Sequence, residues 1–134
     1  LLSIRKPKLS NGKTWGVLDA KAFTYTLSWQ KALDSGAGLP FLEHDFLTIP
    51  VYLKKHYSLV IVCEPSRIFK PAKSEDNAPL DMVLYDSALS RTDAAAVFGG
   101  CKLVLSVLAK ETHPHVDTEN VDMVLKEANC IVLG

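Results

Sequence analysis

Residues 44–65, HDFLTIPVYLKKHYSLVIVCEP, contain two strongly apolar runs on either side of a short charged break. Both runs, 45–53 and 56–64, are rich in β-branched and aromatic residues, and both are short enough to be strands. Pro50 in the first run suits an edge strand or a bulge, because proline has no N–H to give to a central ladder. The stretch therefore predicts two consecutive strands, with His56 at the start of the second.

The rest of the chain predicts two further strands and two helices. LDMVLYD is expected to form a third strand over 80–86, and a fourth is expected over 121–133. One helix is expected over the second half of 19–33, and another over 90–111, which opens close to a capping box. These segments predict an α+β fold, in which helices pack on a mixed sheet.

Length and charge indicate one compact domain over 1–134. The chain has 134 residues, 48% of them hydrophobic, and its 15 basic and 15 acidic residues give a formal net charge of zero. We therefore expect no attraction to nucleic acid or to an anionic membrane. No apolar run approaches the roughly 18 residues that a membrane span requires.

The start of the chain and its cysteines bear on the cellular compartment. LLSIRKPKLSNGKTW places apolar residues before basic ones, the reverse of a signal peptide, and has no initiator methionine, so we expect a processed chain or an excised fragment. The three cysteines are widely spaced, each within an apolar run: Cys63, Cys101 and Cys130. Such cysteines fit free thiols in a reducing compartment, and we expect the nucleus or the cytoplasm.

A long polar connection is expected at 65–79, PSRIFKPAKSEDNAP. It holds three prolines and a Ser-Glu-Asp-Asn cluster. Because this composition leaves little to bury, we expect 66–79 to be poorly ordered, and its deletion to change the melting temperature only slightly.

Two titratable residues stand at strand ends, since His56 opens one expected strand and Asp86 closes the next. If these strands pair as antiparallel neighbours, the two side chains should lie roughly 2.6–3.2 Å apart. An aspartate that binds one ring nitrogen fixes the tautomer and leaves the other nitrogen to act as a general base. The same pair also fits a structural contact at the rim of a sheet.

In this order along the chain, DFLTIPVYLKKHYSLVIVCEP, MVLYDS and CKLVLSVLAKE resemble the Ulp-type cysteine proteases, which cleave SUMO and related ubiquitin-like proteins. Upstream, SWQKAL resembles the family's Arg-Trp-Thr-Lys-Lys segment. By this resemblance His56 takes the place of the catalytic histidine and Asp86 that of the catalytic aspartate. Tyr57 takes the place of a substrate-binding tryptophan beside the active site. Further matches to the family are Trp29, Pro50, Tyr85, Ser87, Cys101 and Lys102.

The resemblance implies a papain-like fold of the Ulp type, of which this chain is an incomplete part. It also implies a cysteine peptidase that cleaves after the C-terminal Gly-Gly of SUMO or another ubiquitin-like protein. We expect a monomer without a cofactor. Two alternatives stay open: an inactive relative that binds a ubiquitin-like partner, and an unrelated soluble α+β domain with a structural His–Asp pair.

The chain departs from the family pattern in several places. Tyr57 replaces tryptophan, SRIFKPAKSEDNAP lengthens the connection between His56 and Asp86, and the family's amino-terminal Trp-Leu-Asn-Asp is missing. The family's nucleophile lies in Asp-Cys-Gly and follows a glutamine, but this chain has no Asp-Cys-Gly, and Gln30 is its only glutamine. We therefore expect the nucleophile just beyond Gly134.

Cys130 is the other candidate nucleophile. It lies in ANCIVLG, with no glycine after it and Val124 where the glutamine should be. Its apolar neighbours predict a buried, inert strand residue, for which Cys130→Ser would cost about 1–3 kcal/mol.

A metal site is not predicted. THPHVD offers His113 and His115, but no cysteine or carboxylate lies at a recognised zinc spacing from them.

Overall fold

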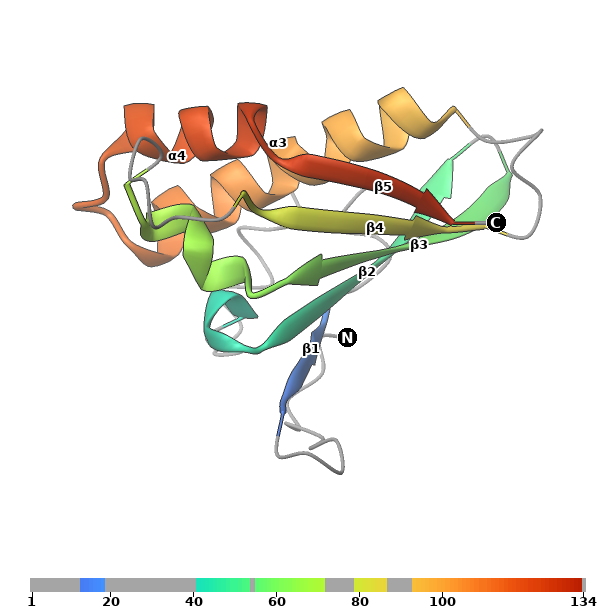
Figure 1. The fold of residues 1–134 in the computed structure, drawn as a ribbon, viewed down its shortest axis with the longest axis horizontal. Helices are drawn as coiled ribbons and strands as arrows, with labels where there is room; N and C mark the ends of the chain where they lie inside the picture. The colour runs from blue at the N-terminus through green and yellow to red at the C-terminus, as the bar shows by residue number, and fades with distance from the viewer. Residues whose placement is uncertain (1–12, 19–40, 54, 72–78, 87–92, 134) are drawn as a thin grey trace.

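The computed structural model describes residues 13–18, 41–53, 55–71, 79–86 and 93–133, which form a five-stranded sheet with two helices on one face (Figure 1). The strands are β1 (Trp15–Val17), β2 (Phe46–Leu53), β3 (His56–Cys63), β4 (Asp81–Tyr85) and β5 (Asn129–Leu133). The helices are α3 (Ala94–Thr112) and α4 (Thr118–Lys126), and two 3₁₀ turns are η1 (Phe41–Glu43) and η2 (Pro65–Phe69). The predicted α+β class is confirmed.

The sheet is mixed, as predicted. Its strands lie in chain order, with β2, β3 and β4 antiparallel in succession and with β1 and β5 parallel to their neighbours at the two edges. The parallel pairing of β4 with β5 requires a crossover, which α3 and α4 provide. The strands predicted at 45–53, 56–64 and 80–86 match β2, β3 and β4 within one residue at each end.

β2 and β3 form a tight hairpin, in which Leu53 pairs with His56 across two residues. Lys55 in this turn has φ 62°, the left-handed conformation that two-residue hairpin loops require. Pro50 lies beyond Thr48, the last residue of β2 that pairs with β1, so it has the edge position predicted for it.

β1 is attached to the sheet edge beside Asp45. The Asp45 carboxylate accepts hydrogen bonds from the backbone N–H of Thr14 at 2.8 Å and from its hydroxyl at 3.2 Å. The Thr14 N–H lowers the pKa of Asp45 below its ordinary value of 3.8. In the middle of β1, Gly16 packs closely on the buried His44 ring. A Cβ atom at Gly16 would stand 2.7 Å from the imidazole.

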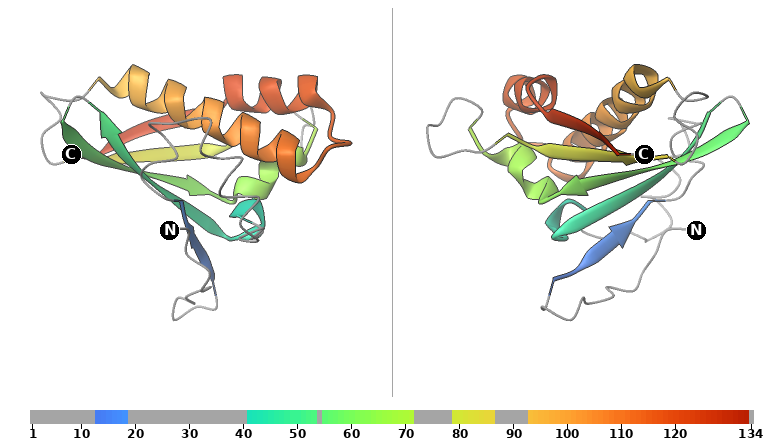
Figure 2. Two further views of the ribbon diagram at one scale, coloured as in Figure 1. Left: turned by 180° about the vertical axis from the view of Figure 1, so that it is seen from behind. Right: turned by 45° about the vertical axis from the view of Figure 1, so that its right-hand side comes forward.

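The hydrophobic core lies between the sheet and the two helices, which cover the same face (Figure 2). Alternate residues of the three central strands point into it and are fully buried: Leu47, Ile49, Val51, Val60, Val62, Met82 and Leu84. The buried side of α3 contributes Val97, Phe98, Cys101, Val104, Leu105, Leu108 and Ala109. Within the described part of the chain, no helix has the length and apolarity to cross a bilayer.

α3 begins at Ala94, because the Asp93 carboxylate accepts a hydrogen bond from the backbone N–H of Ala96 at 3.1 Å. The predicted start at 90 lies outside the described residues, as does the helix expected in 19–33. The helix continues through Gly99, where nothing lies within 4 Å of the place that a Cβ atom would take. Close packing therefore does not explain this glycine.

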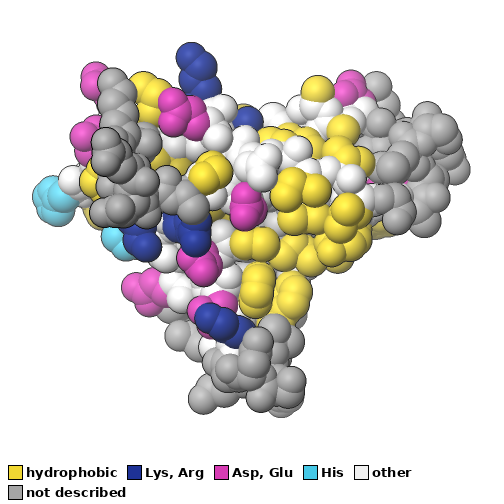
Figure 3. Space-filling view, viewed as in Figure 1, with side chains coloured by type: hydrophobic (Ala, Val, Ile, Leu, Met, Phe, Trp, Pro, Cys, Tyr) yellow, Lys and Arg dark blue, Asp and Glu magenta, His cyan; other side chains and the backbone are white. Residues whose placement is uncertain are grey.

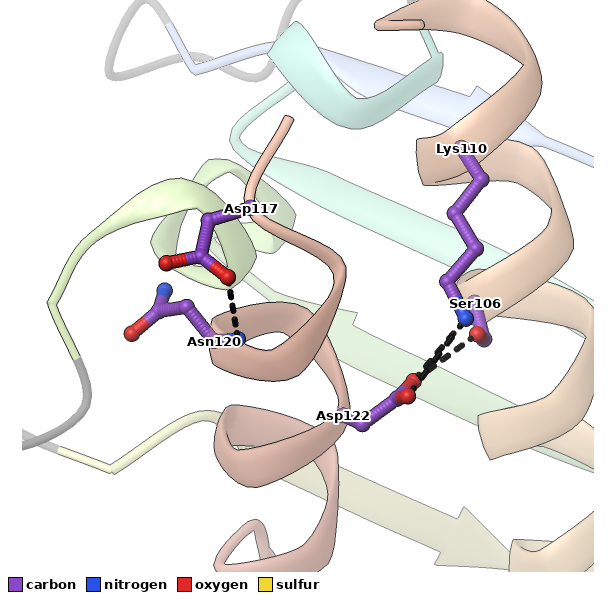
Figure 4. Close-up of polar contacts among 5 residues, drawn as sticks. All are labelled: Ser106, Lys110, Asp117, Asn120 and Asp122. Atoms are coloured by element: carbon purple, nitrogen blue, oxygen red, sulfur yellow. Dashed lines mark hydrogen bonds and ion pairs between the residues drawn. The ribbon is translucent and has the colours of Figure 1, made fainter. Parts of the chain in front are cut away.

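The prediction of a single strand over 121–133 is wrong in its first half, where α4 forms. Val121, Val124 and Leu125 are spaced as on one face of a helix, and all three are buried. Asp117 caps the helix by accepting a hydrogen bond from the backbone N–H of Asn120 at 3.1 Å (Figure 4). The strand is confined to Asn129–Leu133.

A polar cluster on the surface joins α4 to α3 (Figure 4). Asp122 of α4 accepts hydrogen bonds from the Ser106 hydroxyl at 3.2 Å and from Lys110 Nζ at 3.1 Å. The Lys110 and Asp122 side chains are 38% and 59% exposed, so the ion pair contributes little more than orientation.

The connection after β3 is partly folded, contrary to the prediction of poor order over 66–79. Pro65 and Ile68 of η2 are buried, and the Phe69 ring lies 4.2 Å from that of His113. The prediction failed because it averaged the apolar start of the segment with the polar residues that follow. Residues 72–78 lie outside the described part of the chain.

The face of the sheet turned away from the helices carries exposed aromatic side chains. Tyr57 is 66% exposed, Tyr85 44% and Tyr52 39%, and each alternates with inward-facing residues of its strand. Figure 3 shows hydrophobic side chains gathered over the strands on this side. The sheet thus has one covered face and one apolar, solvent-exposed face.

Candidate active site

His56 and Asp86 meet where β3 begins and β4 ends. β3 and β4 are antiparallel, with Leu59 paired to Tyr85, so the residues next along each strand converge. His56 Nε2 lies 2.8 Å from Asp86 Oδ1 and 2.9 Å from Oδ2. The predicted distance is confirmed, and the pair is brought together by strand register across a connection of 29 intervening positions.

The Asp86 carboxylate is buried and well supplied with donors. Its side chain is 1% exposed, and the Ser58 hydroxyl donates a hydrogen bond to Oδ2 at 2.7 Å. The Asp86 backbone N–H donates to the carbonyl oxygen of Leu133 at 3.3 Å. A buried carboxylate is stable as an anion only when donors replace its water, and here a hydroxyl and an imidazole N–H do so.

The position of Asp86 determines which nitrogen of His56 can take up a proton. Because Asp86 accepts a hydrogen bond from Nε2–H, the lone pair of the neutral ring lies on Nδ1. The His56 side chain is 17% exposed, so the ring is held by the protein yet still reached from solvent. The arrangement is that of a general base whose tautomer is fixed by a carboxylate.

Tyr57 follows His56 but points to the opposite face of β3, as alternation along a strand requires. Its ring packs on Tyr52 of the neighbouring strand, with ring centroids 4.5 Å apart. The structure therefore does not bring Tyr57 into the His56–Asp86 contact. Its predicted role in substrate binding stays a prediction.

Two of the three cysteines are far from the pair or inaccessible. Cys63 ends β3, seven positions from His56, which corresponds to about 23 Å along a strand. Burial raises the pKa of the Cys63 thiol, and the nearby Asp81 carboxylate raises it further. Cys101 is buried in α3, and this burial raises the pKa of its thiol to about 12. Neither thiol is suited to act as a thiolate at neutral pH.

Cys130 lies in β5, as predicted, but the prediction of burial is wrong, since this residue is exposed. The reason is its place in an edge strand of the described sheet: no residue of β5 is buried, whereas β3 and β4 each have two buried residues. Cys130 pairs with Met82, four positions before Asp86, which corresponds to about 13 Å along the strand. The predicted cost of Cys130→Ser falls accordingly to about 0.5 kcal/mol or less.

The two histidines considered as metal ligands lie in the turn after α3. Both are exposed, and His113 packs on Phe69 while its Nδ1 lies 2.8 Å from the Thr112 hydroxyl. Among the residues that the structure describes, no three histidine, cysteine or carboxylate side chains are grouped as metal ligands would be.

Ser58 is the site residue that the sequence interpretation missed. The signal was present, because Ser58 stands two residues after His56 and alternate residues of a strand share a face. A serine in that position, among the apolar residues of a core strand, requires a polar partner, and the partner is Asp86.

Comparison with known proteins finds a similar fold but no similar sequence. No protein-family model matches the chain, and no curated protein has a similar sequence. Among solved structures, one described as the crystal structure of the de-sumoylating protease superimposes with a TM-score of 0.60 and 12% sequence identity. The match covers 90% of this chain and 43% of that one, so this chain spans less than half the length of the solved protein. The described α+β fold is therefore similar to that of a de-sumoylating protease.

Proposed function

We propose that this chain carries the histidine and the aspartate of a cysteine peptidase that acts on SUMO or another ubiquitin-like protein. The observation that carries the proposal is the His56–Asp86 contact, which leaves Nδ1 of the imidazole as a proton acceptor. The fold shared with a de-sumoylating protease supports the choice of substrate class.

In the proposed chemistry, His56 transfers the proton and Asp86 orients His56. Nδ1 of His56 takes the proton of a thiol, and the thiolate attacks the carbonyl carbon of the second glycine in the Gly-Gly tail of the substrate. The new sulfur–carbon bond forms a tetrahedral adduct, from which the leaving amine departs with the proton that the imidazolium returns. Water then hydrolyses the thioester. The buried carboxylate of Asp86 stabilises the imidazolium and holds its tautomer.

We propose that the thiol comes from none of the three cysteines of this chain. Cys63 and Cys130 lie about 23 Å and 13 Å from the pair along their strands, and Cys101 is buried. The carboxyl end of β5 lies at Asp86, because the Leu133 carbonyl accepts a hydrogen bond from Asp86 N–H. Figure 1 shows β5 ending beside the end of β4. Any segment that continued the chain after β5 would therefore emerge beside the His56–Asp86 pair.

The distances of Cys63 and Cys130 from the His56–Asp86 pair also favour a second candidate function. A relative that has lost its nucleophile would keep the fold and the His56–Asp86 contact, and would bind a ubiquitin-like partner without cleaving it. The exposed aromatic side chains on the open face of the sheet, Tyr57 and Tyr85, fit such a binding surface.

Reaction with SUMO that carries a vinyl sulfone in place of its C-terminal carboxylate tests the proposal. The full-length protein is expected to form a covalent adduct, and His56→Gln is expected to abolish it because the thiol is no longer deprotonated. Cys130→Ser is the matched control and should react like the wild type. A parallel probe built on ubiquitin measures specificity.

Each other outcome has a definite meaning. An adduct on Cys130 itself would overturn our placement of the nucleophile. Binding of SUMO by calorimetry without any adduct would replace the peptidase by the second candidate. If the protein neither binds SUMO or ubiquitin nor forms an adduct with either probe, the His56–Asp86 pair is a structural contact.

A further inference from the structure

We propose that Ser58 is a positioning residue of the site: its hydroxyl fixes the rotation of the Asp86 carboxylate and thereby the direction in which Nδ1 of His56 points. This inference rests on the proposed function, because the direction of Nδ1 matters only if a nucleophile is deprotonated there.

The geometry of the carboxylate shows why a second donor matters. His56 Nε2 lies 2.8 Å from Oδ1 and 2.9 Å from Oδ2, so the imidazole hardly distinguishes the two oxygens of Asp86. Ser58 Oγ donates to Oδ2 at 2.7 Å. This hydrogen bond makes the two oxygens different and opposes rotation of the carboxylate about its bond to Cβ.

The hydroxyl is held by the same rigid element as the imidazole. His56 and Ser58 lie two positions apart on one face of β3, and both are paired with residues of β2, Leu53 and Val51 respectively. A strand with regular pairing opposite both residues keeps their spacing constant. Asp86 follows the end of β4, and two side chains of β3, His56 and Ser58, therefore orient its carboxylate.

Burial makes the serine hard to replace. The Asp86 side chain is 1% exposed, so water has little access to the oxygen that Ser58 contacts. Removal of the hydroxyl leaves the carboxylate with one fewer donor in a place where solvent does not compensate. The carboxylate should then turn, and the hydrogen bond to Nε2–H should weaken.

The exchange of the His56 Nε2–H proton with water, measured by NMR on the 134-residue chain where the imidazole is neutral, tests this role without any peptidase activity. Ser58→Ala is expected to speed exchange by roughly tenfold or more, the factor that corresponds to one hydrogen bond to a charged group. Ser58→Thr keeps a hydroxyl and should return the rate close to that of the wild type. Ser106→Ala removes another serine-to-aspartate bond, in the exposed cluster of Figure 4, and should change nothing.

A serine that merely satisfies a buried polar atom would lower stability and leave the exchange rate unchanged. Equal rates in Ser58→Ala and Ser106→Ala would therefore overturn the inference. Should Ser58→Ala fail to fold, Ser58→Cys offers a similar volume with a weak donor, and a wild-type rate in that variant would overturn it as well. Failure of the proposed function is separate: it appears as absence of the vinyl sulfone adduct while the exchange rates of the Ser58 variants still differ as expected.

Discussion

At Gly16 a Cβ atom would stand 2.7 Å from Cδ2 of the buried His44 ring, whereas at Gly99 it would meet nothing within 4 Å. Gly16→Ala should lower the free energy of unfolding by about 1–3 kcal/mol, because the imidazole has little room to move. Gly99→Ala, on an exposed position of α3, should raise it by about 0.5–1 kcal/mol. Urea unfolding of the two variants measures both effects, and equal values would contradict the packing of β1 on His44.

Single residues were the level at which the sequence was most informative about the site. His56 and Asp86 are polar residues at the ends of apolar strands, and antiparallel pairing alone places such ends together. The exposure of Cys130 was not predictable, because an apolar neighbourhood in sequence does not reveal whether a strand lies in the centre or at the edge of a sheet. Catalysis by the pair stays a prediction.

At the scale of elements, the attachment of β1 should depend on pH through Asp45. The Thr14 N–H lowers the pKa of this carboxyl in the folded state, so Asp45 favours folding above its ordinary value of 3.8. This contribution should be lost as the pH falls below 3.8 through the lowered pKa, since the protonated acid no longer favours the folded state.

Urea unfolding of the wild type and of Asp45→Asn, at a series of pH values from neutral to below 3.8, measures this contribution. The difference between the two proteins should be present at neutral pH and should shrink in acid. A difference that stays constant over the whole series would show that the charge of Asp45 does not hold β1.

η2 should contribute to stability as part of the core. Ile68 is 1% exposed, so Ile68→Ala should cost about 2–5 kcal/mol in the free energy of unfolding. The neighbouring Ser66 is exposed, and Ser66→Ala should change stability by about 0.5 kcal/mol or less. Both are measured by urea unfolding, and a similarly small effect at Ile68 would restore the interpretation of the segment as a removable insertion.

Elements were predicted well where the hydrophobic pattern has a single period. β2, β3 and β4 are short apolar runs bounded by turns or polar residues, and their bounds follow directly. α4 was missed because 121–133 contains two patterns in succession, a helical one around Val124 and a continuous apolar one from Cys130. The helix start signal at Asp117 was overlooked, although its carboxylate caps α4.

At the scale of the whole molecule, the α+β class and the mixed sheet were predictable, but the two-sided character of the sheet was not. The open face carries exposed tyrosines on β2, β3 and β4, and in the sequence these residues resemble ordinary core positions. The order of five strands, with β1 at one edge, depends on a three-residue strand too short to carry a pattern of its own. Long-range pairing decides such features, and local periodicity does not reveal it.

The crossover between β4 and β5 also determines when the molecule can assemble during synthesis. His56 and Asp86 belong to neighbouring antiparallel strands and can meet as soon as β4 leaves the ribosome, whereas β5 follows only after residues 86–128 have been made. At a usual elongation rate that interval lasts roughly 2–9 s, long compared with the closing of a hairpin. During it, the outer edge of β4 lacks the partner that it has in the finished sheet. A nascent chain should thus acquire its histidine–aspartate contact early, and then depend on chaperones or on fast formation of α3 to protect β4 until β5 arrives.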